Sequence, residues 1–167
     1  MTPSSSTPKT VVIADDTAYV RDRFAAALQG AGHRAVGVKS ADDLLARLGS
    51  AKEPADLVVL DLRLQSPGLE LVRSIHAVDD KLPILVFSGS INSAEEVREL
   101  VTLGVAGYVN EYSAVQHILP SLAPHLFPDS FNRRTSTRVV LGIPVACRFG
   151  NTIAAATATL SDRACVR

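Results

Sequence analysis

The chain has 167 residues, of which 47% are hydrophobic, and this length suits one ordinary domain with a short extension. Its 17 basic residues balance its 17 acidic ones, and no apolar run approaches the length of a membrane span, so we expect neither a DNA partner nor a membrane association. The two cysteines lack metal-type spacing and the first ten residues lack the apolar stretch of a signal peptide, which predicts a cytoplasmic protein.

Short apolar runs alternate with segments of helical periodicity along the first 125 residues. The apolar runs predict strands buried on both faces, and apolar residues three or four apart predict helices. In chain order the predicted elements are strand 10–14, helix 20–31, strand 34–38, helix 41–48, strand 56–60, helix 69–78, strand 83–87, helix 94–103, strand 107–109 and a helix from about 112. This alternation predicts an α/β fold with a doubly wound five-stranded parallel sheet covered on both faces.

Polar residues follow the carboxyl ends of the predicted strands, where doubly wound sheets carry their chemistry. Asp15 and Asp16 follow the first strand, Asp61 the third and Ser88 the fourth. Three carboxylates at one edge repel each other unless a cation neutralises them, and Mg²⁺ prefers such oxygen ligands. Asp61 would then act as a nucleophile toward a phosphoryl group, with Ser88 donating to a phosphoryl oxygen. The alternative is that these aspartates only cap the helices that follow them.

Four of these stretches resemble the receiver domain of two-component response regulators. The matching residues are 12–16 (VIADD), 57–62 (LVVLDL), 84–89 (ILVFSG) and 104–109 (GVAGYV). The resemblance implies a flavodoxin-like fold with strand order 2-1-3-4-5. It also implies a module of phosphorelay signal transduction that is not an enzyme and that is phosphorylated by a histidine kinase or a phosphotransfer protein.

The resemblance assigns a role to each residue of the acidic site. Asp61 would be the phosphoacceptor, Ser88 would contact the phosphoryl group and Tyr108 would be the aromatic switch residue. The implied Mg²⁺ ligands are Asp15, Asp16, Asp61 and the backbone carbonyl of Arg63. A phosphotransfer enzyme on a similar fold is disfavoured, because hydrolases with an aspartyl nucleophile usually carry a second aspartate where this chain has Arg63.

Glu111 departs from the family pattern, because receivers carry an essential lysine at this position. A carboxylate there reverses the attraction between lysine and phosphate, which at surface-like dielectric changes the energy by several kcal/mol. Alternatively, Glu111 turns outward and begins the last helix, where a carboxylate suits the helix dipole. The loop 61–68 also lacks a family proline and is one residue short. Signalling by phosphorylation of Asp61 and signalling by protein contact both stay open.

The C-terminal residues predict a β-hairpin, with apolar runs at 139–149 and 152–160 about a turn at 150–151. Arg134 and Arg138 form an Arg-x-x-x-Arg motif similar to the start of a PilZ domain, whose arginines grip cyclic di-GMP. This resemblance gives the alternative function of a cyclic di-GMP effector. Because the second motif of that family keeps only its serine and most of the barrel is missing, we expect no tight binding of cyclic di-GMP by this chain.

The predicted organisation is a disordered leader, a receiver-like domain, a linker and an incomplete PilZ-like segment, at 1–9, 10–124, 125–132 and 133–167. The segment ends inside a strand-like run, which suggests a piece of a longer protein. The expected contact face for a downstream protein or a second copy comprises the helix at 94–103, the strand at 107–109 and the last helix. There the break at Pro120 is expected to expose apolar side chains, namely Ile118, Leu119 and Leu122.

Overall fold

A computed structural model describes most of the chain. The described residues are 7–50, 52–89, 93–109 and 118–127 with their side chains, and 138–149 and 152–161 as backbone strands. No helix within these ranges is long and apolar enough to cross a membrane.

Strands and helices alternate as the periodicity predicts. The elements are β1 (Thr10–Ala14), α1 (Ala18–Gly30), β2 (Arg34–Val38), α2 (Ala41–Leu48), β3 (Leu57–Leu60), the short 3₁₀ helix η1 (Leu62–Leu64), α3 (Gly68–Val78), β4 (Ile84–Phe87), α4 (Ala94–Thr102), β5 (Gly107–Val109), α6 (Ile118–Leu126), β6 (Arg138–Phe149) and β7 (Thr152–Ser161). The first nine predicted elements are confirmed within a few residues of their bounds.

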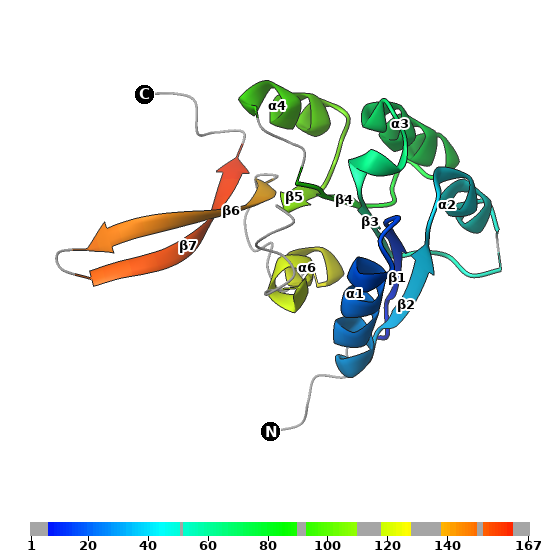
Figure 1. The fold of residues 1–167 in the computed structure, drawn as a ribbon, viewed down its shortest axis with the longest axis horizontal. Coiled ribbons are helices and arrows are strands. Elements are labelled where there is room, and N and C mark those ends of the chain that lie inside the picture. Colours follow the sequence, from blue (N-terminus) through cyan, green and yellow to red (C-terminus); the bar gives the residue numbers. More distant parts are fainter. Residues whose placement is uncertain are drawn as a thin grey trace.

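The first five strands are parallel and follow the order 2-1-3-4-5, which confirms the predicted fold class. The sheet continues beyond β5, because β6 adds in parallel and β7 pairs antiparallel with β6. It therefore has seven strands, because the two segments predicted as a hairpin at 139–149 and 152–160 join the five strands predicted for the sheet. Figure 1 shows these two C-terminal strands projecting from one side of the helix-covered body.

Helices cover both faces of the sheet and form two separate cores (Figure 1). Helices α2, α3 and α4 pack on one face, where Leu44, Leu71 and Leu100 are buried. Helices α1 and α6 pack on the other face around Phe24 and Leu122. Because helices cover both faces, the central strands β1, β3 and β4 are almost entirely apolar and buried, and polar groups follow at their carboxyl ends.

Local signals in the sequence fix the helix ends. The Ser40 side chain accepts a hydrogen bond from the backbone N–H of Asp43, and Ser93 forms a capping box with Glu96 at the start of α4. Gly32, which follows α1, has a φ of 83°, in the left-handed region that glycine adopts without strain. These signals mark the starts of α2 and α4 and the end of α1, whereas α1 and α3 begin without a side-chain cap.

The last helix differs from its prediction. Its expected start near 112 lies outside the described residues, and α6 continues through Pro120 and Pro124 as far as Leu126. Pro120 is tolerated because the first turn has no partner for a backbone N–H. The expected exposed patch is wrong: Ile118 and Leu122 are buried, and Leu119 packs partly against the same core. The apolar face of α6 therefore covers the sheet, and it is not a partner surface.

Candidate functional site

The acidic site lies where β1 and β3 end side by side. The backbone N–H of Asp61 donates to the carbonyl of Ala14 at 2.9 Å, and that of Asp15 donates to Val38 at 3.2 Å. These bonds continue the parallel ladder by one residue beyond each strand, so both carboxylates leave the sheet at the same edge. Parallel pairing therefore brings together residues that stand 46 positions apart in the chain.

The predicted metal ligands Asp15, Asp16 and Asp61 form one cluster. Each offers a carboxylate oxygen, and the three oxygens lie within 4.8 Å of one another. Asp15 and Asp61 are each only 1% exposed, whereas Asp16 is exposed to solvent. Two buried carboxylates and one exposed carboxylate thus concentrate negative charge in a site that opens to solvent on the Asp16 side.

Asp15 has the features of a cation ligand. Its Oδ1 accepts a hydrogen bond of 2.7 Å from the backbone N–H of Thr17, but its Oδ2 is buried without any hydrogen-bond partner. Burial raises the pKa of this carboxyl, with a smaller contribution from the neighbouring charge of Asp61. A buried carboxylate oxygen without a donor is costly unless a cation meets it, so the donor set fits a hard divalent ion such as Mg²⁺.

Asp61 is held by Arg63, and sequence reasoning missed this contact. The Nε of Arg63 lies 2.9 Å from Oδ2 and 3.2 Å from Oδ1 of Asp61, and the backbone N–H of Arg63 donates to Oδ1 at 2.9 Å. The side chain of Asp61 is fully buried, whereas that of Arg63 is 46% exposed. The turn of η1 makes the contact, since it brings the side chains of residues two apart together. The predicted role of the Arg63 carbonyl as a metal ligand stays a prediction.

Ser88 and Tyr108 lie together at the ends of β4 and β5. Ser88 is fully buried, and Tyr108 is 4% exposed with its hydroxyl donating to the backbone carbonyl of Ser88 at 2.9 Å. The structure therefore links the predicted phosphoryl contact to the predicted aromatic switch residue, with the tyrosine ring turned inward. Glu111 and Arg134 lie outside the described residues, and Arg138 is described only as the first backbone position of β6.

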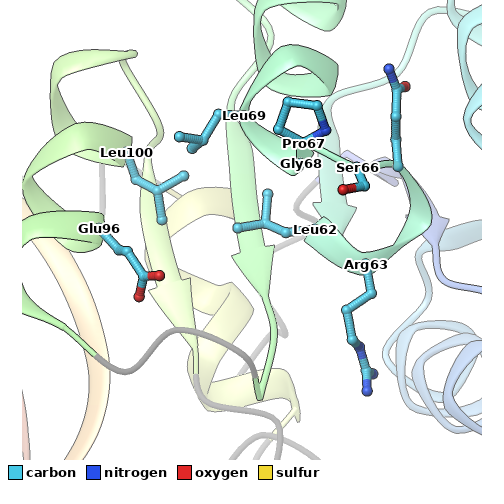
Figure 2. A pocket seen from close by; sticks show the side chains of 9 residues that line it. Leu62, Arg63, Ser66, Pro67, Gly68, Leu69, Glu96 and Leu100 are labelled. Carbon is cyan, nitrogen blue, oxygen red and sulfur yellow. The ribbon is translucent and has the colours of Figure 1, made fainter.

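A groove of about 470 Å³ lies beside the acidic site, between η1, the start of α3 and α4 (Figure 2). Leu62, Leu69 and Leu100 supply its apolar lining, and Glu96 lies at its α4 side. Gly68 permits the close approach of η1 to α3, because a Cβ there would lie 2.5 Å from the carbonyl oxygen of Leu62. None of the three clustered aspartates lines this groove, but Arg63 does, and this residue also contacts Asp61.

Comparisons with known proteins agree with this geometry. The family model of the response regulator receiver domain matches residues 11–122. Among solved structures, a CheY-like receiver domain protein from Methanospirillum hungatei is 20% identical, with a TM-score of 0.65, and the match covers 75% of this chain and 98% of that chain. A receiver protein from Pseudomonas putida is 28% identical, with a TM-score of 0.62 and coverages of 70% and 97%. A search of curated proteins found no match. The chain belongs to the family of response regulator receiver domains.

Proposed function

We propose that this receiver domain is a phosphorelay module in which Asp61 accepts a phosphoryl group and Asp15 and Asp16 hold Mg²⁺. Two observations carry this proposal: Asp15 has a buried carboxylate oxygen without a hydrogen-bond partner, and it offers a carboxylate oxygen within 4.8 Å of those of Asp16 and Asp61. Helix capping alone does not account for the site, because Oδ1 of Asp15 accepts the backbone N–H of Thr17 while the buried Oδ2 has no hydrogen-bond partner. Bound Mg²⁺ would neutralise the carboxylates and the oxygens of an incoming phosphoryl group.

The chemistry of phosphorylation follows from the placement of Asp61. One of its carboxylate oxygens would attack phosphorus on a phosphohistidine, forming a P–O bond while the P–N bond breaks and its electron pair returns to the imidazole nitrogen. Ser88 lies at the end of β4, two strands from Asp15 in the sheet order, and its hydroxyl would donate to a phosphoryl oxygen. The donor would be a histidine kinase or a phosphotransfer protein.

Labelled phosphoryl transfer from a small phosphodonor tests this proposal. The wild-type chain with Mg²⁺ should incorporate label, the Asp61→Asn variant should not, and chelation of Mg²⁺ should abolish incorporation. Asp56→Asn is a matched control, because Asp56 is a half-exposed carboxylate that binds Lys9 and the backbone of Thr10 away from the site. Equal labelling of wild type and Asp61→Asn would show that another residue accepts the phosphoryl group.

Coupling of the phosphate to an output is proposed to be atypical. Glu111 occupies the position of the family's lysine, so no lysine there ties the phosphate to the end of β5. A phosphoryl mimic should therefore leave Tyr108 in its inward position. That result would favour signalling through contact with another protein over signalling through phosphorylation. Replacing Glu111 with lysine should restore the response of Tyr108 to the mimic.

The alternative of a cyclic di-GMP effector stays a prediction. The family match ends at residue 122, and the described part of the C-terminal segment is a pair of strands that extends the receiver sheet. No described side chain favours a nucleotide site there.

A further inference from the structure

The strongest unassigned feature of the site is the ion pair between Arg63 and Asp61. Two N–H groups of Arg63 converge on one carboxylate: the backbone N–H donates to Oδ1, and the Nε–H is shared between both oxygens, at distances between 2.9 and 3.2 Å. Because the Asp61 side chain is fully buried, solvent screens this ion pair less than a pair between two exposed groups.

The chemistry of the guanidinium suits a phosphoryl group as well as a carboxylate. It is planar, stays charged at all physiological pH values and presents its donors in a fork that matches carboxylate and phosphate oxygens. The Arg63 side chain is 46% exposed and extends from η1 away from the leucines that line the groove (Figure 2). The side chain therefore has room to move outward when a phosphoryl group is attached to Asp61.

The charges at the site also require a second cation. Three carboxylates converge there, and a divalent ion neutralises only two of their negative charges. A phosphoryl group on Asp61 adds further negative charge, and the position of the family's lysine holds Glu111. Among the described side chains, Arg63 contacts one of these three carboxylates directly, whereas Arg21 donates to the backbone carbonyl of Asp15 at 2.7 Å.

From these contacts we propose that Arg63 is the phosphoryl-binding cation of this receiver, acting from the loop after β3 in place of the lysine after β5. The inference rests on the proposed function of Asp61 as phosphoacceptor. In the unmodified protein Arg63 pairs with the Asp61 carboxylate, and after modification it pairs with the phosphoryl oxygens. Before modification the same guanidinium competes with Mg²⁺ for the Asp61 carboxylate. Removal of the guanidinium should therefore strengthen the binding of Mg²⁺ alone and weaken the binding of a phosphoryl mimic.

Beryllofluoride binding, measured at saturating Mg²⁺ for each variant, tests the proposal. Arg63→Ala should weaken beryllofluoride binding about tenfold or more, since a charge-assisted hydrogen bond is lost. The same variant should bind Mg²⁺ alone more tightly than wild type. Arg63→Lys should recover part of the beryllofluoride affinity, because it keeps the charge but loses the planar fork.

Two further variants separate the possible results. Arg98→Ala removes an exposed arginine that pairs with Glu95 on α4, and it should leave both affinities at the wild-type values. Asp61→Asn should abolish beryllofluoride binding. If Asp61→Asn binds as wild type does, the proposed function fails. If wild type binds through Asp61 and Arg63→Ala binds equally well, the proposed function stands and the role of Arg63 is overturned.

Discussion

The hydroxyl of Tyr108 donates a hydrogen bond of 2.9 Å to the backbone carbonyl of Ser88, which joins the ends of β4 and β5 next to the acidic site. The tyrosine ring itself is buried in the core. An outward rotation of the ring would break this bond, so the energy of the bond is part of the cost of any such rotation.

Replacing Tyr108 with phenylalanine should lower the free energy of unfolding by about 1 kcal/mol, because a buried hydrogen bond is lost and the ring packing is kept. Chemical denaturation of both proteins measures the difference. Tyr19→Phe is the matched control, since Tyr19 is 61% exposed and its replacement should change stability very little. Equal stability of Tyr108→Phe and wild type would mean that the hydroxyl bond contributes nothing.

Leu122→Ala should destabilise the chain by about 2–5 kcal/mol, because Leu122 is fully buried between α6 and the sheet and its truncation leaves a cavity. Thermal and denaturant unfolding measure the loss. Val101→Ala on α4 is the control, since Val101 is 39% exposed. A Leu122→Ala variant as stable as wild type would restore the idea that α6 presents an apolar surface to a partner.

Much of this fold was predictable because its signals are local. The apolar runs of β1 and β3, the serine caps of α2 and α4 and the glycine after α1 each determine their element within a few residues. The partner face was not predictable, because Ile118, Leu122 and Leu126 form an apolar stripe whose burial depends on how α6 docks on the sheet. Likewise, the added strands depend on pairing between segments about 30 residues apart.

The residues of the acidic site were likewise only partly predictable from the sequence. Asp15, Asp16 and Asp61 were found from strand ends, because parallel strands leave their last residues at one edge of the sheet. The contact of Arg63 with Asp61 was missed, since it depends on the turn geometry of η1 and on side-chain direction. A basic residue two positions after a buried strand-end aspartate was the available signal.

Asp15→Asn should raise the stability of the metal-free protein at neutral pH. Burial raises the pKa of Asp15 above 3.8, so the folded chain holds this proton more tightly than the unfolded chain and the ionised carboxylate lowers stability. Stability of wild type should therefore fall as pH rises above about 3.8, and this component should vanish in the variant. Unfolding measured against pH, with the exposed Asp22→Asn as control, tests the sign. A less stable Asp15→Asn would contradict it.

His125 should make the protein less stable in mild acid. Burial lowers the pKa of this imidazole below 6.5, and its Nε2 is buried without a hydrogen-bond partner. Below pH 6.5 the unfolded chain therefore binds the proton more readily, so stability is full above this pH and falls as the pH decreases toward the folded-state pKa. His125→Gln should remove that decrease in denaturation curves at pH 7.5 and 5.5. An unchanged decrease in the variant would assign it to other groups.

A crystal structure of the 167-residue chain with Mg²⁺ and beryllofluoride would test the central claim most directly. We expect beryllium to be bonded to a carboxylate oxygen of Asp61, the metal to be held by Asp15 and Asp16, and the guanidinium of Arg63 to donate to the fluorides. Beryllofluoride bound away from Asp61, or a metal that is not coordinated by Oδ2 of Asp15, would contradict the assignment of this site as the phosphoacceptor centre.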